Sequence, residues 1–225
     1  MTIAPGTRIV IVRHGESVSN ASGLIGGHAG CAGLTELGVR QVEILAARLA
    51  HTGELAGAAA LYSSLMRRAG ETADLLATAL GDPPRVSTCE VCEQHPGEAD
   101  GMTWVDYESS YGPVPVDRGA DWRLSPGGES WVEMLDRAAA ELHRIALEYP
   151  GELVVIAAHG GVVVASMIRL LQVPGHGTTT SLYPGNASIT EWRHTGLRWR
   201  LVRYNDTAHL AAPTSVPGSP ALPWG

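Results

Sequence analysis

The chain is organised around the stretch Ile9-Val10-Ile11-Val12-Arg13-His14-Gly15. Its first four residues are β-branched and unbroken by polar residues, which predicts a strand buried on both faces, as in a parallel sheet covered by helices. Such sheets bind ligands at the carboxyl ends of their strands. Arg13 offers a planar fork of donors suited to phosphate, and His14 can act as a nucleophile or a proton carrier. Taken alone, the pair is equally consistent with incidental polar residues at a strand end.

The composition limits the class of protein. The chain has 225 residues, of which 44% are hydrophobic, and a formal net charge of −7. This length suits one α/β domain, and the charge argues against a nucleic-acid partner. No signal-peptide pattern is present, the longest apolar stretch is interrupted by His159-Gly160-Gly161, and three cysteines give no disulfide framework. We expect a cytoplasmic protein with no membrane partner, with one domain over residues 1–212 and a mobile, proline-rich tail over residues 213–225.

Hydrophobic periodicity divides the chain into alternating strands and helices. Besides the first strand, the pattern predicts strands at 58–62, 85–88 and 153–158, helices at 35–49, 66–80, 128–149 and 162–171, and a closing hairpin at 187–194 and 198–204. Residues 17–33 are expected to form a loop beside the site. Residues 89–121 are also expected to be irregular, and a connection of that length is typical of a functional wall or lid.

A second strand ends in the same way as the first. The apolar run Leu153-Val154-Val155-Ile156-Ala157-Ala158 leads into His159-Gly160-Gly161, and a helix is expected to follow. Parallel strands of one sheet end at the same edge. His14 and His159 can therefore meet at the switch point of the sheet.

Two consecutive arginines, Arg67 and Arg68, open the helix expected at 66–80. Cations in the first turn of a helix oppose its dipole. This local cost favours the interpretation that at least one arginine faces an anion, and a solvated surface pair is the alternative.

Other candidates carry weaker signals. Asn20 and His28 lie in the loop at 17–33 and could contact a ligand, although His28 is equally consistent with an ordinary loop residue. Cys89-x-x-Cys92 raises a metal or redox interpretation. Neither is favoured, because the chain has no second cysteine pair and the motif lacks the strand–helix context of a redox site.

Several motifs occur together in one order. They are Arg13-His14-Gly15-Glu16-Ser17, Asn20, Leu34-Thr35-x-x-Gly38-x-x-Gln41, Ser63-Ser64 with Arg68-Ala69-x-x-Thr72-Ala73, Glu93 with Gly97 and Gly101, and His159-Gly160-Gly161. This series resembles the histidine phosphatase superfamily, also called the phosphoglycerate mutase-like family, over residues 8–170. The resemblance implies an α/β three-layer sandwich with a mostly parallel central sheet, and a phosphohistidine mechanism that uses no metal and no cofactor.

The resemblance also implies a role for each matching residue. The nucleophile is His14, the phosphate ligands are Arg13 and Arg68, the second pocket histidine is His159, the proton donor is Glu93, and further substrate contacts are Asn20 and Gly160. The sequence departs from the family pattern at Leu65, where an acidic residue or proline is common, and at Pro96, where an aromatic residue is often found. The second departure leaves the substrate undetermined.

The chemistry is consistent with these roles without reference to the family. A phosphate monoester is dianionic near neutral pH, and its transfer needs positioning and charge neutralisation, which two arginines and a histidine supply. A neutral imidazole is a competent nucleophile, and a carboxylic acid can protonate the leaving oxygen. Glu93 is preferred to Glu90 as this acid for its spacing from Gly97 and Gly101, whereas Glu98 and Asp100 are expected to be solvated. The sequence does not decide which imidazole nitrogen is phosphorylated.

The favoured function is a metal-independent phosphatase acting on a small phosphorylated metabolite. A phosphoglycerate mutase dependent on 2,3-bisphosphoglycerate is the main alternative, but a second anionic group calls for extra basic residues, and only Arg118 and Arg123 lie between Glu93 and Glu129. A non-catalytic phosphate-binding module is less favoured because the expected catalytic residues are all present. A metal-dependent hydrolase using both histidines and a homodimer remain open. Residues 95–122 are expected to select the substrate.

Overall fold

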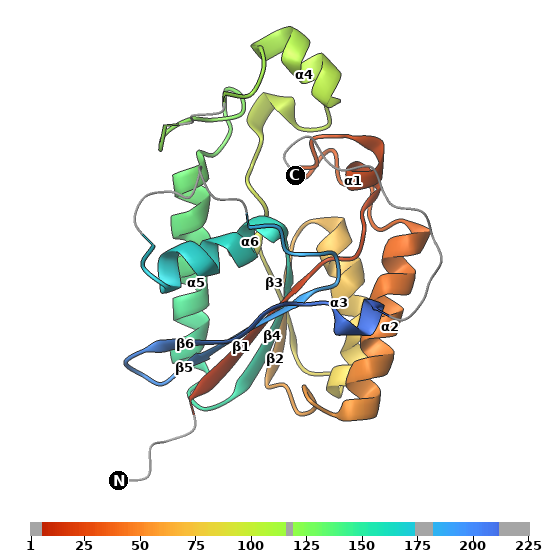
Figure 1. Cartoon of the computed structure of the whole chain (residues 1–225), viewed down its shortest axis with the longest axis vertical. Helices are drawn as coiled ribbons and strands as arrows, with labels where there is room; N and C mark the ends of the chain where they lie inside the picture. The colour runs from red at the N-terminus through yellow and green to blue at the C-terminus, as the bar shows by residue number, and fades with distance from the viewer. Residues whose placement is uncertain (1–5, 116–118, 174–181, 212–225) are drawn as a thin grey trace.

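The computed structural model describes residues 6–115, 119–173 and 182–211, and they form an α/β fold around one sheet (Figure 1). The strands are β1 (Thr7–Arg13), β2 (Ala60–Ser64), β3 (Arg85–Thr88), β4 (Leu153–Ala158), β5 (Ile189–His194) and β6 (Trp199–Asp206). Their order is β3-β2-β4-β1-β5-β6. The first four run parallel, and β5 is antiparallel to both of its neighbours. The expected parallel core and closing hairpin are both confirmed.

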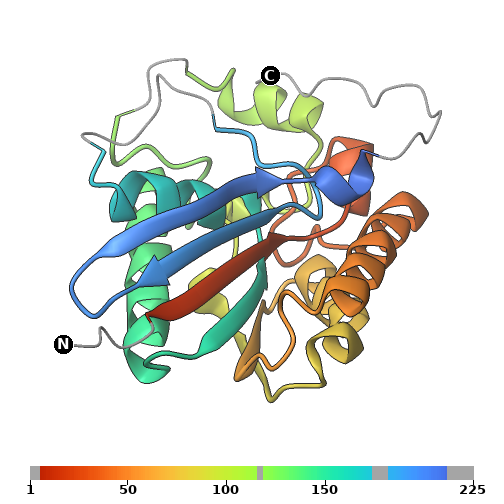
Figure 2. The same ribbon diagram turned by 60° about the horizontal axis from the view of Figure 1, so that its bottom comes forward.

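Helices cover both faces of the sheet, which makes three layers. One face carries α2 (Glu36–Thr52) and α3 (Arg67–Leu80), and the other carries α5 (Trp131–Glu148) and α6 (Gly160–Ala165). Figures 1 and 2 show the sheet between these two pairs. The expected three-layer sandwich is therefore confirmed.

The alternation of side chains along β1 divides the core between the two faces. Ile9 and Ile11 pack against the α5 side, whereas Val10 and Val12 pack against α2 and α3. All four side chains have no exposed surface. A strand with both faces buried can be apolar at every position, which is the pattern that the sequence shows.

The structure differs from the expected elements in three places. Residues 17–33 contain the short helix α1 (Val18–Ser22), and residues 89–121 contain α4 (Trp104–Tyr111). Each helix buries a single side chain, so neither produces a hydrophobic period in the sequence. The helix expected at 162–171 is α6 followed by a π-helical segment, Ser166–Leu170. The tail expected at 213–225 lies outside the described residues.

Within the described ranges, none of the helices is both long enough and apolar enough to cross a membrane.

Candidate active site

The two histidines expected at the strand ends lie against each other. β1 and β4 are parallel neighbours, and the backbone N–H of His14 donates to the carbonyl of Ala158 at 2.9 Å. The imidazole centroids of His14 and His159 are 5.2 Å apart, with the rings at 64°. Both side chains are buried. The pairing of two strands thus brings together residues that are distant in the sequence.

The hydrogen bonds of His14 show which ring nitrogen carries the proton. Nδ1 lies 2.6 Å from the carbonyl oxygen of Gly15, which can only accept, so Nδ1 carries the proton. Nε2 accepts a hydrogen bond from Nε of Arg68 at 3.1 Å. Burial, followed by the charges of Arg68 and Arg13, lowers the pKa of His14 well below its usual value. His14 is therefore a neutral imidazole whose nucleophilic atom is Nε2.

Three buried polar atoms around this imidazole have no hydrogen-bond partner among the described residues. They are Nε of Arg13, Nη1 of Arg68 and Nδ1 of His159. Buried polar groups are almost always paired, and an unpaired one is costly. An anion with several oxygens would satisfy these groups together, and two guanidinium groups favour a phosphate.

The other ring nitrogen of His159, Nε2, contacts a serine hydroxyl. This nitrogen lies 2.8 Å from Oγ of Ser64, at the carboxyl end of β2. Burial and the Arg68 charge lower the pKa of His159 well below its usual value, so the ligand-free imidazole is neutral. A bound phosphate dianion would act in the opposite direction and favour protonation.

The two arginines at the start of α3 have different environments. Arg68 is buried and contacts His14, whereas Arg67 is exposed and pairs with Glu71 at 2.6 Å. The N-terminus of α3 also has no side-chain cap. Arg68 is therefore the arginine of this pair that lies at the candidate anion site.

The carboxylate of Glu93 reaches the turn that follows β4. Its Oε2 accepts a hydrogen bond from the backbone N–H of Gly161 at 3.0 Å, and its Oε1 accepts one from that of Gln94 at 3.1 Å. Glu90 is exposed instead. This geometry favours Glu93 over Glu90 as a proton donor to a substrate held beside His159.

The expectation that Asp100 is solvated is wrong. Its carboxylate is half-buried and accepts hydrogen bonds from the backbone N–H groups of Gly27, Ala29 and Gly30 at 2.8–2.9 Å. Asp100 therefore fixes the loop after α1. Glu98 is exposed, as expected.

The motif at residues 34–41 supports the loop that carries His14. Oγ1 of Thr35 caps α2, and Oε1 of Gln41 accepts the backbone N–H of Glu16 at 2.8 Å. A Cβ atom added to Gly38 would lie 2.0 Å from the carbonyl oxygen of Glu16. Glycine is required at this position because the two backbones are in direct contact.

Gly160 and Asn20 are the two further substrate contacts that the resemblance implies. Gly160 is adjacent to Arg13, because an added Cβ would lie 3.6 Å from its Nε. Asn20 lies in α1, and its side-chain oxygen accepts a hydrogen bond from Oγ of Ser17 at 2.8 Å. The structure therefore places Gly160 at the site and gives Asn20 a local partner.

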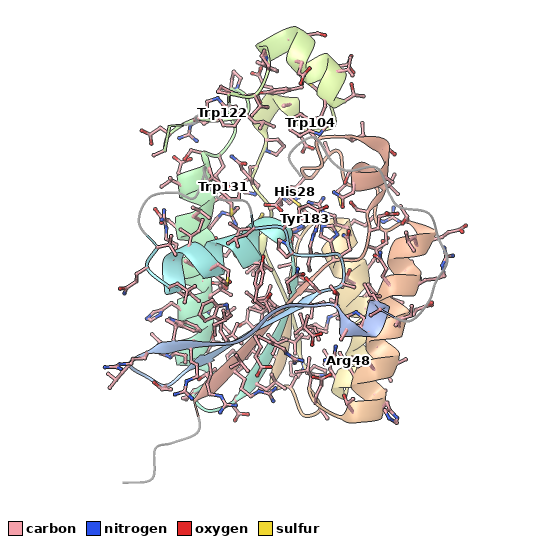
Figure 3. All side chains as sticks on the ribbon, viewed as in Figure 1. His28, Arg48, Trp104, Trp122, Trp131 and Tyr183 are labelled. Carbon is pink, nitrogen blue, oxygen red and sulfur yellow. The ribbon has the colours of Figure 1, made fainter. Side chains whose placement is uncertain are left out.

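Sequence reasoning missed the segment that precedes β5. Nδ2 of Asn186 donates to the carbonyl oxygen of His14 at 3.1 Å, and the carbonyl of Pro184 accepts a hydrogen bond from Nη1 of Arg13. The Arg13 guanidinium also lies 5.3 Å from the ring centroid of Tyr183, which Figure 3 labels beyond the upper ends of the strands. The only local signal was a Pro-Gly-Asn turn before an expected strand.

We predict that Gly161→Ala displaces the Glu93 carboxylate and leaves the fold intact. An added Cβ would lie 2.0 Å from Oε1 of Glu93 and 2.4 Å from Cε of Met134, and both atoms end flexible side chains that can move. If Glu93 is the general acid, kcat for an alkyl phosphate falls about 10- to 100-fold, because displacement removes only part of the roughly 10²–10⁴-fold that general acids contribute. Steady-state kinetics and thermal unfolding measure the two effects.

Gly70→Ala is the matched control for Gly161→Ala. Gly70 lies within α3, and a Cβ added there meets nothing within 4 Å. Equal kinetic losses in the two variants, or a collapse of thermal stability in Gly161→Ala, would contradict the displacement of Glu93.

Comparisons with known proteins agree with this geometry. The model of the histidine phosphatase superfamily (branch 1) matches residues 9–207. A metal-independent phosphoserine phosphatase from Arabidopsis thaliana is 31% identical over 209 residues, covering 92% of this chain and 84% of the relative. Phosphoglycerate mutase-like protein 4 from the same plant is 30% identical over 207 residues, covering 90% and 86%.

A solved structure has the same arrangement of elements. It is a mycobacterial glucosyl-3-phosphoglycerate phosphatase in complex with VO3, with a TM-score of 0.72 and 28% identity, covering 88% of this chain and 98% of its own. The family match spans both strand-end histidines and the buried arginines around them. The chain therefore belongs to the histidine phosphatase superfamily, in its branch 1.

Proposed function

We propose that this chain is a phosphatase that hydrolyses a small phosphomonoester through a phosphohistidine at Nε2 of His14. The observation that carries the proposal is the set of three unpaired buried nitrogen atoms around an unprotonated Nε2. Such a pocket fits a phosphoryl group and places a nucleophile beside it.

The reaction follows from the positions of the side chains. Nε2 of His14 attacks phosphorus, the bond to the leaving oxygen breaks, and Glu93 donates a proton to that oxygen. Arg13, Arg68 and His159 neutralise the charge on the transferring group. Water then attacks phosphorus, the bond between phosphorus and Nε2 of His14 breaks, Glu93 takes a proton from this water, and inorganic phosphate leaves.

The surroundings of Glu93 favour a phosphatase over a mutase. The acid-loop region is the segment between Glu93 and Glu129, and Arg123 is one of its two arginines. Both carboxylate oxygens of Glu133 hold Arg123, with the closer nitrogen–oxygen distance 2.5 Å. Arg123 also donates to the carbonyl of Gly128. Arg118 lies outside the described residues. An arginine engaged in this way is poorly placed to bind the second anionic group that a mutase requires.

The relatives and the acid-loop region limit the choice of candidate substrates. The names of two relatives make phosphoserine and glucosyl-3-phosphoglycerate the first compounds to test. Trp104 and Trp122 lie with α4 in the uppermost part of Figure 3. Tyr107 packs with Ile25 and Ala99 in a small core, whereas Tyr111 and Trp122 line a pocket of about 360 Å³. Tyr107 is therefore a core residue, whereas Tyr111 and Trp122 are placed where they could contact a substrate.

The proposal is tested by release of inorganic phosphate from these two compounds and from 3-phosphoglycerate. Release without added bisphosphoglycerate is the expected result. Interconversion of phosphoglycerates that depends on 2,3-bisphosphoglycerate and outpaces phosphate release would instead establish a mutase.

We predict that Glu93→Gln slows phosphoryl transfer from alkyl phosphates far more than from p-nitrophenyl phosphate. An alkoxide needs a proton to leave, whereas p-nitrophenolate leaves as an anion. Single-turnover kinetics at one pH isolate the first chemical step from the later activation of water. Glu90→Gln is the matched control, because Glu90 is exposed. Equal losses for both leaving groups, or a selective loss in the control, would exclude Glu93 as the acid.

A further inference from the structure

Four metal-ligating side chains gather next to the acid loop. They are His28 in the loop after α1, Cys89 and Cys92 at the two ends of a short turn after β3, and His95 three residues further on. One ligand atom from each lies within 4.8 Å of every other. Sγ of Cys89 is 3.4 Å from Nε2 of His28 and 3.3 Å from Nε2 of His95, and Sγ of Cys92 is 3.8 Å from Nε2 of His28.

The three sulfur–nitrogen distances match those of a four-coordinate metal site. Zn–S bonds of about 2.3 Å and Zn–N bonds of about 2.0–2.1 Å, arranged as a tetrahedron, place neighbouring ligand atoms about 3.3–3.8 Å apart. Two thiolates and two imidazoles are a donor set that suits Zn²⁺. Cys89-x-x-Cys92 was not favoured as a metal site for want of a second cysteine pair, but the structure supplies two histidines in its place.

The backbone that carries the cysteines is held in place from outside the cluster. Cys89–Val91 form a single 3-10 turn, and the backbone N–H of Cys92 donates to the carbonyl of Cys89 at 2.9 Å. Nη1 of Arg137 donates to the carbonyls of Cys89 and Cys92 at 2.8 and 3.2 Å. The turn is therefore supported independently of any ligand between the two sulfur atoms.

A carboxylate lies beside the His95 ring, and the backbone around His28 is fixed. Oε2 of Glu129 lies 3.8 Å from Nδ1 of His95, on the ring edge opposite the nitrogen that faces Cys89, and Glu129 is itself paired with Arg137. A carboxylate behind a metal-binding histidine is a common supporting arrangement. On the other side, the amides of Gly27 and Ala29, which flank His28, are fixed by the carboxylate of Asp100.

We propose that His28, Cys89, Cys92 and His95 bind one Zn²⁺ ion that has a structural role. All four positions of the tetrahedron are filled by protein side chains, so no position remains for water or substrate. The ion would join the loop after α1 to the acid loop. Glu93 directly follows Cys92, whose Sγ accepts a hydrogen bond from Oγ of Ser64, the partner of His159. The site would thus fix the backbone of Glu93 without taking part in phosphoryl transfer.

The metal content of the purified full-length protein tests the proposal directly. Inductively coupled plasma mass spectrometry is expected to find one zinc per chain in the natural protein and little in Cys92→Ser or His28→Gln. His28 is exposed, so its variant should fold even if the buried Cys92 tolerates no change. Cys31→Ser is the matched control, because Cys31 is the one cysteine outside the cluster and should leave the zinc content unchanged.

Cobalt substitution tests the geometry and the ligands. Protein stripped under reducing conditions and titrated with Co²⁺ should develop the visible bands of tetrahedral cobalt and a sulfur-to-cobalt charge-transfer band. Loss of His28 should weaken cobalt binding at least about tenfold. No metal in the natural protein together with no cobalt spectrum would overturn the proposal, as would unchanged cobalt binding in His28→Gln. These measurements involve no turnover, so they stand apart from the phosphatase proposal.

Discussion

His14→Ala is expected to abolish turnover and leave the fold intact. The imidazole provides the nucleophilic Nε2, and no other buried side chain in the described part of the site offers a lone pair in the same position. Loss of a nucleophile costs several orders of magnitude, so kcat should fall at least about 10⁴-fold. Steady-state assays on an alkyl and an aryl phosphate measure the loss, and circular dichroism verifies the fold.

The natural protein should also form a covalent intermediate at this residue. Rapid quench with a labelled substrate is expected to trap a phosphoenzyme that is labile in acid and stable in base, with phosphorus on Nε2 of His14. Peptide mapping and phosphorus NMR identify the residue and the nitrogen. His51→Ala, at an exposed position near the end of α2, is the matched control and should label normally. Robust turnover by His14→Ala, or labelling at another residue, would exclude the assignment.

The second large effect is expected at Arg68. Its Nε orients His14 and its unpaired Nη1 faces the position of an anion, so Arg68→Ala removes both interactions at once. Loss of a charge-assisted phosphate contact should reduce kcat/KM about a hundredfold or more, which corresponds to about 2.7 kcal/mol. Arg68→Lys should recover little of this loss, because an ammonium group lacks the planar fork of donors.

Arg67→Ala provides the matched control on the same turn of α3. Arg67 is exposed and its partner is Glu71, so its loss should change kcat/KM only a few-fold. A greater loss in Arg67→Ala than in Arg68→Ala would mean that the register assigned to this helix is wrong.

The sequence predicts the parts of the site that lie at the ends of regular elements. The apolar runs before Arg13 and His159 identify two buried strands, and the edge rule for parallel sheets then brings the histidines together. A positive charge in the first turn of a helix is unfavourable without an anion, which indicates that Arg67 or Arg68 faces one, and the resemblance to the family selects Arg68. The structure brings the two histidines together and buries Arg68 against His14.

What the sequence did not predict depends on contacts between distant loops. Asn186 reaches His14 only because antiparallel β5 lies beside β1, and no local pattern encodes that pairing. The Asp100 carboxylate is held by hydrogen bonds from backbone N–H groups some seventy residues earlier in the sequence. The partners of Cys89-x-x-Cys92 were missed for the same reason, because His28 precedes Cys89 by 61 residues.

The place of β1 in the sheet constrains how the protein assembles during synthesis. β1 is translated before the other strands of this sheet, yet it lies between β4 and β5, with Arg8 opposite Leu153 and Thr7 opposite His194. Such distant pairings form slowly, since a long segment of chain must be ordered before they are made. A nascent chain that ends before β4 therefore carries His14 without His159 and without Ala158, whose carbonyl accepts the backbone N–H of His14. The site around His14 is complete only after the segment from β4 to Asn186 has been translated.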